Sequence, residues 1–73
     1  MSSGDHHPNL THRERELLPY IVMGMKNHEI AVLLVITTGT VEQHLHNILL
    51  KTQTRNRVQL AVYAVRHNLV PEI

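Results

Sequence analysis

The hydrophobic residues between positions 10 and 25 recur at the three- and four-residue spacing of an amphipathic helix. Thr11 followed by Glu14 forms a capping box, in which each side chain bonds the other residue's backbone N–H, so the helix is predicted to begin here. Gly24 is expected to end it, because glycine readily adopts the left-handed conformation of a helix C-terminus. Pro19 lies inside this stretch and removes one backbone hydrogen bond, so we predict that this first helix is kinked at Pro19.

The second apolar stretch, Ile30 to Ile36, is seven residues long and has two interpretations. Its β-branched residues are typical of a buried strand. Glu29, just before it, instead favours the first turn of a helix that starts at Asn27, because a carboxylate is stabilised by the positive end of the helix dipole. No other strand-like run exists for a strand to pair with, so we expect a helix over about residues 27–34.

The third predicted helix covers about residues 38–52, with Thr37 as its N-cap. At 100° per residue its side chains separate into two faces. The apolar face consists of Val41, Leu45, Ile48 and Thr52, with His44 and Leu49 on its flanks, and the opposite face of Glu42, Gln43, His46, Asn47 and Leu50. The short link over residues 35–37 joins this helix to the second one, and two helices joined in this way are a candidate helix-turn-helix.

The last predicted helix begins at Asn56, where Gln59 is expected to complete a second capping box, and it runs to about His67. Asn68 can adopt the left-handed conformation that ends it. The helix is apolar nearly all round, although a terminal helix of a small domain has only one face to bury. We therefore expect its second apolar stripe to pack against a partner, most simply in a homodimer. This stripe consists of Val58, Val62 and Val65.

These four stretches predict an all-α fold, a compact four-helix domain over residues 10–70 that contains the helix-turn-helix. Residues 1–9 are expected to be a flexible tail or linker, and residues 71–73 a C-terminal tail. With 73 residues the core is small, which favours a partner subunit. The longest apolar run has seven residues, whereas a membrane span needs about 20. The N-terminus does not resemble a secretory signal, and a cytoplasmic protein is expected.

Enzymatic chemistry is not expected from this sequence, and neither a cofactor nor a metal ion is predicted. The chain has no Cys, no Gly-rich phosphate loop and no metal-ligand spacing. Its charge is asymmetric. Residues 1–43 carry three basic and five acidic side chains, and residues 44–73 carry four basic and one acidic side chain. The basic C-terminal half is compatible with a polyanionic partner, although the net charge of the whole chain is only +1.

An ordered set of short motifs over about residues 10–70 resembles the DNA-binding domain of LuxR/FixJ-type bacterial transcription regulators. The matching stretches are Leu10-Thr11, Arg13-Glu14-Arg15-Glu16, Gly24, Asn27, Glu29-Ile30-Ala31, Gly39-Thr40-Val41, His44-Leu45, Asn47-Ile48-Leu49, Lys51, Arg55, Arg57, Leu60-Ala61, Tyr63-Ala64, Arg66-His67 and Leu69-Val70. Each piece alone is weak evidence, but the set in this order, without gaps, is highly specific.

The resemblance implies that the third helix enters the major groove of double-stranded DNA and that the last helix pairs two subunits on a pseudo-palindromic site. The base-reading positions of the family correspond to Glu42, Gln43 and His46. The residues implied to contact the DNA backbone or to brace the helix are Thr38, Thr40, Lys51, Arg55 and Arg57, and Asn47 is a further backbone candidate. A sensing or receiver domain could precede such a domain.

Several implied roles have structural alternatives. His44 is interpreted as a histidine at the edge of the core. One of Arg55 and Arg57 could pair with Glu14 or Glu16 and so be structural. The valine stripe of the last helix could belong to the core of a single subunit, although an interface is favoured.

The sequence also departs from the family pattern. Glu42 stands where the family usually has Lys, and Leu50 where a basic residue is frequent. Val35 and the Thr52-Gln53 pair replace the usual Gly and Leu-Gly. Two hypotheses therefore stand side by side: a sequence-specific DNA-binding domain that acts as a dimer, and a protein-interaction module of the same fold with weak or lost DNA binding.

Overall fold

Four helices make up the computed structural model, which describes residues 9–71. They are α1 (His12–Val22), α2 (Asn27–Leu34), α3 (Thr38–Thr52) and α4 (Arg57–Arg66). No strand occurs within the described range, so the predicted all-α class is confirmed and the strand interpretation of residues 30–36 was wrong. The predicted tails of residues 1–9 and 71–73 lie outside the described residues except for Asn9 and Pro71.

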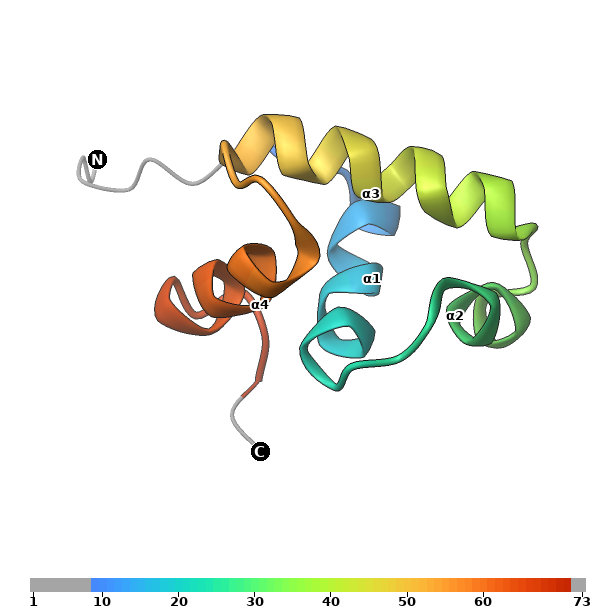
Figure 1. The fold of residues 1–73 in the computed structure, drawn as a ribbon. Helices are drawn as coiled ribbons and strands as arrows, with labels where there is room; N and C mark the ends of the chain where they lie inside the picture. Colours follow the sequence, from blue (N-terminus) through green and yellow to red (C-terminus); the bar gives the residue numbers. More distant parts are fainter. Residues whose placement is uncertain (1–8, 72–73) are drawn as a thin grey trace.

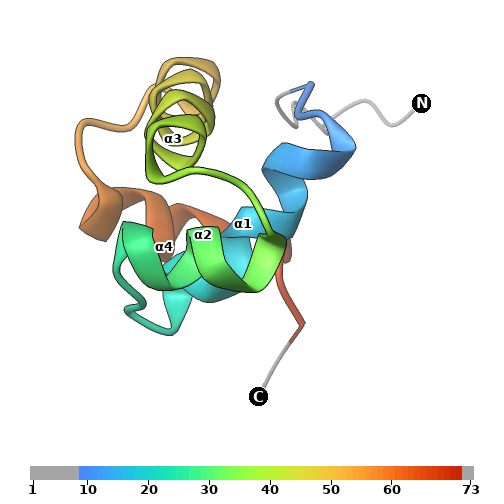
Figure 2. The same ribbon diagram turned by 90° about the vertical axis from the view of Figure 1, so that its right-hand side faces the viewer.

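The third helix packs against all of the other three, and α1 also packs against α4. Figure 1 shows α3 lying across one side of the domain, with α1 beneath its middle, α2 near its first turns and α4 near its last. In the turned view α3 is seen nearly end-on, with the other three helices on one side of it (Figure 2). The opposite side of α3 therefore faces away from the domain.

The core between the helices is aliphatic. Its six largest fully buried side chains come from all four helices, and they are Leu17, Leu18, Ile30, Val41, Ile48 and Leu60. Burial of one such side chain stabilises a fold by roughly 1.5–3 kcal/mol. Because these residues meet in one cluster, the position of α3 is fixed by apolar contacts with its neighbours. None of the described helices is long and apolar enough to span a bilayer.

The first helix begins and ends as its sequence predicts. Thr11 Oγ1 accepts a hydrogen bond from Glu14 N (3.1 Å), and Glu14 Oε1 accepts one from Thr11 N (2.9 Å), so the capping box is complete. Gly24 adopts a φ of 83°, and Met25 N donates to Tyr20 O (3.0 Å), which closes the helix in a Schellman motif. The helix continues through Pro19, and the kink there stays a prediction.

The turn of the helix-turn-helix has an unusual backbone for its sequence. Val35 ends α2 in the left-handed region, with φ 58° and ψ 48°, while its side chain is 88% exposed. Ile36 N then donates to Ala31 O at 3.0 Å, which gives one of the last carbonyl groups of the helix a hydrogen bond. A β-branched residue is disfavoured in this region because its Cβ crowds the backbone. Glycine, which has no Cβ, would avoid that crowding.

The last two helices match their predicted faces and ends closely. In α3, Val41, Ile48 and Thr52 are buried, and Thr37 Oγ1 accepts from Thr40 N (3.1 Å) as the predicted N-cap. Asn56 caps α4, and Asn68 has the predicted positive φ, 55°. The helix ends at Arg66, one residue before the predicted His67.

The second capping box was predicted incorrectly at one bond. Gln59 Oε1 accepts from Arg55 N (2.9 Å), one residue before the cap, and not from the backbone N–H of Asn56. The Gln59 side chain therefore gives the backbone N–H of Arg55, in the loop that leads into α4, a hydrogen-bond acceptor and holds Arg55 close to the helix start.

Candidate nucleic-acid interface

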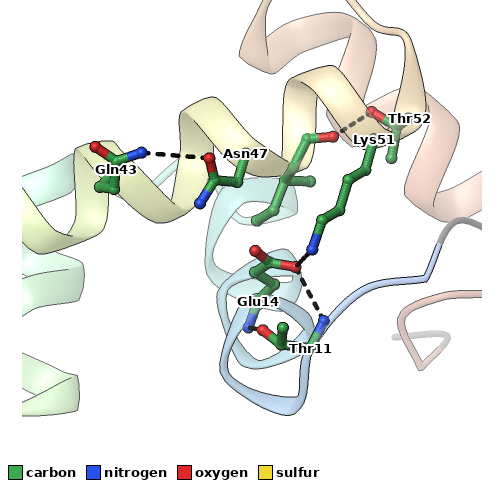
Figure 3. Close-up of polar contacts among 7 residues, drawn as sticks. Thr11, Glu14, Gln43, Asn47, Lys51 and Thr52 are labelled. Atoms are coloured by element: carbon green, nitrogen blue, oxygen red, sulfur yellow. Dashed lines mark hydrogen bonds and ion pairs between the residues drawn. The ribbon is translucent and has the colours of Figure 1, made fainter.

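The face of α3 that points away from the core carries the polar side chains predicted to read bases. Glu42, Gln43 and His46 are all exposed, and Asn47 is half-buried beside them. Gln43 Nε2 donates to Asn47 Oδ1 at 3.3 Å, one helical turn further on (Figure 3). This bond links two amide side chains on the outer face and leaves Gln43 Oε1 and one Nε2 hydrogen free to bond a ligand.

The N-terminal turn of α3 is arranged around two threonine hydroxyl groups. Thr37 Oγ1 and Thr40 Oγ1 are 2.9 Å apart. Thr40 is exposed, whereas Thr38 is half-buried. The first backbone N–H groups of a helix and the positive end of its dipole favour an anion such as a phosphate. The positive partial charge at this end of α3 is therefore complementary to the negative charge of a nucleic-acid backbone.

Lys51, at the far end of α3, lies against Glu14 of α1. Its Nζ is 2.7 Å from Glu14 Oε1 (Figure 3), and the side chain of Glu14 is only 4% exposed. Burial by itself would raise the pKa of Glu14. The hydrogen bonds from Lys51 and from the backbone of Thr11, together with the Lys51 charge, outweigh burial, and the pKa is lowered below its ordinary 4.5.

Arg57 braces the fold in a similar way. Its guanidinium donates from Nη1 to Asn27 Oδ1 (2.9 Å) and from Nη2 to Met25 O (2.5 Å), so that it ties the start of α4 to the start of α2. The alternative that Arg55 or Arg57 pairs with Glu14 or Glu16 was wrong. Lys51 is the partner of Glu14, while Arg13 and His12 are the partners of Glu16.

The predicted DNA-backbone residues therefore differ in availability. Arg55 and Thr40 are exposed near opposite ends of α3. Lys51 and Arg57 have the bracing role that was the alternative for them, and phosphate contact by either residue stays a prediction. His44 is half-buried, in keeping with its interpretation as a residue at the edge of the core.

The valine stripe of α4 lies on the surface of the single chain. Val58, Val62 and Val65 are 71%, 49% and 54% exposed, while Leu60 and Ala64 supply the buried face of the same helix. The alternative that these valines fill the core of one subunit was therefore wrong. They form an apolar strip that is open to a partner.

A second apolar surface was not predicted from the sequence. In α2 only Ile30 and Ala31 are buried, whereas Val32 and Leu33 are 75% and 54% exposed. A shallow apolar groove lies over Met25, His28, Glu29, Val32 and Leu33. The polar residues at positions 28 and 29, four residues before Val32 and Leu33, could have marked this face as the outer one.

The helices α2 and α3 form a helix-turn-helix, and the second of them has an exposed polar face. A model of the luxR family of bacterial regulatory proteins matches residues 8–64, most of the chain. The chain belongs to the luxR family. It is therefore a helix-turn-helix DNA-binding domain of the kind found in bacterial transcription regulators, a family that is not enzymatic.

Individual luxR-family proteins are similar over the same region. LnrK of Bacillus subtilis (strain 168), a transcriptional regulatory protein, and the response regulator VraR of Staphylococcus aureus are each 46% identical over 61 residues, 84% of this chain. The aligned region is 28% of LnrK and 29% of VraR. A crystal structure of Escherichia coli SdiA superposes with a TM-score of 0.83 over 93% of this chain and 29% of that chain, at 34% identity. The present chain thus spans less than a third of these relatives.

Proposed function

We propose that this domain reads double-stranded DNA by inserting α3 into the major groove, with Glu42, Gln43 and His46 directed at base edges. The observation that carries the proposal is the division of α3 into two faces. Val41 and Ile48 are fully buried, so the helix cannot rotate, and the three polar residues remain exposed on the opposite side. The major groove admits one α-helix, and side chains on its outer face are the ones that meet base edges.

Phosphate contacts would position this helix along the duplex. The N-terminal turn of α3 offers its first backbone N–H groups and the hydroxyl groups of Thr38 and Thr40 to one phosphate, whereas the Thr40 N–H is already bonded to Thr37 Oγ1. Asn47 and Arg55 offer donors further along. Lys51 and Arg57 would contribute mainly by holding α3 and α4 in place, because Lys51 Nζ bonds Glu14 and the Arg57 guanidinium bonds Asn27 and Met25 O. The remaining N–H groups of these two cations would be the ones to reach a phosphate.

Two copies of the domain would act together through α4. The exposed strip of Val58, Val62 and Val65 is apolar, and a two-fold axis would place the strip of one subunit against that of the other. Such a dimer would read a pseudo-palindromic site with two half-sites, and it would form on DNA if the strip alone is too small for a stable complex in solution.

The domain would serve as the output part of a larger regulator. VraR is a response regulator by name, and the matched region is less than a third of its length. A receiver or other sensing domain on the N-terminal side would then control access of α3 to DNA, and the protein would act in the bacterial cytoplasm, where the chromosome lies.

A protein-interaction module of the same fold is the second candidate. Leu50, on the outer face of α3, is 65% exposed. Within residues 38–52 Glu42 and Lys51 are the only Asp, Glu, Lys or Arg side chains, and Lys51 is bonded to Glu14. An outer face with an exposed leucine and little positive charge would also suit a protein partner.

The two candidates are distinguished by titrating labelled duplexes, drawn from pooled genomic fragments, at about 50 and 200 mM salt. A DNA reader loses affinity steeply with salt, and a few fragments persist at the higher concentration. A folded domain that binds no duplex at low salt would contradict the proposal of DNA reading and would favour the protein-interaction module.

A further inference from the structure

The outer face of α3 lacks the side chains that most often read guanine. Guanine presents two acceptors, O6 and N7, in the major groove, and Arg or Lys is its usual partner. Lys51 is the only Lys or Arg within residues 38–52, and its Nζ is engaged by Glu14 at 2.7 Å. The one Lys or Arg of this helix is therefore held toward α1 by Glu14 and is not among the exposed residues of the outer face, Glu42, Gln43 and His46.

The same face offers chemistry suited to other bases. Glu42 is exposed, and an ionised carboxylate only accepts hydrogen bonds. It matches the amino group at N4 of cytosine and opposes the acceptors of guanine. Gln43 offers one acceptor and one unused donor, which together match N6 and N7 of adenine.

Asn47 prepares Gln43 for this contact. The 3.3 Å bond from Gln43 Nε2 to Asn47 Oδ1 restricts the Gln43 side chain before DNA arrives. A side chain ordered in advance loses less conformational entropy on binding. Asn47 thus acts as a positioning residue for Gln43.

We propose that α3 selects an A·T pair through Gln43 and a neighbouring C·G pair through Glu42, and that it rejects guanine at the base that Glu42 faces. The proposal rests on the proposed function, because it requires α3 to lie in the major groove. Rejection of guanine is expected to contribute more to specificity than attraction of cytosine. A Glu42 carboxylate oxygen that faces O6 and N7 of guanine brings acceptors together, and these desolvated acceptors are left without donors.

The test begins with selection of high-affinity duplexes from a randomised pool, followed by binding measurements on duplexes changed at one base pair. Replacing the selected cytosine by guanine should weaken binding about 5- to 150-fold, the range of one good base contact. Replacing the selected adenine by 7-deazaadenine removes only the N7 acceptor and should also weaken binding. In N47A the preference for adenine should fall while α3 remains folded by circular dichroism.

Glu42→Gln and Glu16→Gln form a matched pair. Both remove one negative charge, but Glu16 is on α1 and pairs with Arg13. Glu42→Gln should relax the rejection of guanine, and Glu16→Gln should leave every base preference unchanged. If guanine is tolerated by the native domain at each selected position, or if both variants change base preference alike, the proposal is overturned while DNA reading stands. If the folded domain retains no duplex from the pool even at about 50 mM salt, the proposed function fails and this proposal fails with it.

Discussion

Lys51 Nζ lies 2.7 Å from Glu14 Oε1 and joins the last turn of α3 to the first turn of α1. Glu14 also accepts a bond from the backbone of Thr11 (2.9 Å), so one nearly buried carboxylate caps α1 and fixes the end of α3. Nearby, Thr52 Oγ1 donates to Ile48 O (2.8 Å) and fixes the last turn of α3 from within (Figure 3).

Lys51→Met is expected to destabilise the fold by about 1–3 kcal/mol at pH 7, because the nearly buried Glu14 carboxylate loses a charge-assisted hydrogen bond and its cationic partner, while its bond from Thr11 N remains. The pKa of Glu14 is lowered in the native protein, so its ionisation stabilises the fold above the ordinary value of 4.5, and this contribution is lost as pH falls through the lowered value. The difference in unfolding free energy between native and variant should therefore shrink as pH falls from 4.5 through the lowered pKa of Glu14.

Urea unfolding at pH 7 and at about pH 3.5 measures this effect. Arg13→Met is the control, because Arg13 pairs with Glu16 on the surface (3.2 Å) and an exposed pair contributes only about 0–1 kcal/mol. An equal loss for Lys51→Met at both pH values would show that the lysine stabilises through packing and not through the Glu14 charge.

Val35→Gly is expected to stabilise the domain by about 1 kcal/mol. The native φ of 58° is unfavourable for valine and costs glycine nothing, and an 88% exposed side chain gives up little packing. Part of the gain is offset by the greater freedom of glycine in the unfolded chain. Thermal unfolding measures the change.

Val32→Gly, in the interior of α2, is the matched control for Val35→Gly. Val32 is also well exposed, at 75%, but it has a helical backbone, so the same replacement should destabilise by roughly 0.5 kcal/mol. A similar melting point for both variants would refute the account of strain in the turn.

Glu42→Lys is expected to tighten binding to duplexes of unselected sequence, where phosphate contacts supply the affinity. If residue 42 lies at the groove, the new ammonium reaches a phosphate and the slope of log affinity against log salt steepens by about 0.9. Glu16→Lys makes the same charge change on α1, where no DNA contact is proposed, and should steepen the slope less. Fluorescence anisotropy over a salt series measures both slopes, and equal slopes would place residue 42 away from the phosphates.

Val62→Asp is expected to abolish paired binding while leaving each monomer folded. Val62 is 49% exposed, so the monomer should change in stability by less than about 1 kcal/mol, whereas a charge in an apolar interface is costly. Band shifts on duplexes with one and two half-sites measure the cooperativity. Val32→Asp, on the exposed face of α2, should retain it, and a loss in both variants would show that the α4 strip has no special role.

Local signals in the sequence predicted the helices well because the helix ends are determined within a few residues. Thr11 with Glu14 started α1, Thr37 and Asn56 capped α3 and α4, and the two faces of α3 followed from its period. Lys51 with Glu14 and Arg57 with Asn27 could not be paired in advance, because these partners are 37 and 30 residues apart. Which cation reaches which partner depends on how the helices pack, and sequence spacing carries no information on that.

The exposure of Val32 and Leu33 was missed for a related reason. An apolar run as short as Ile30 to Ile36 indicates burial in general and does not say which members a neighbouring helix covers. The base-reading role of Glu42, Gln43 and His46 agrees with their exposure on α3, and it stays a prediction until DNA contact is measured.

The outer face of α3 is proposed to be the surface that meets DNA. An NMR titration of the ¹⁵N-labelled domain with a bound duplex tests it most directly, because each backbone amide reports on its own surroundings. The account predicts that the largest shift changes fall on Glu42, Gln43 and His46 and on the first turn of α3, with little change at Val32 and Leu33. Changes concentrated on α2 or α4, with α3 unaffected, would contradict it.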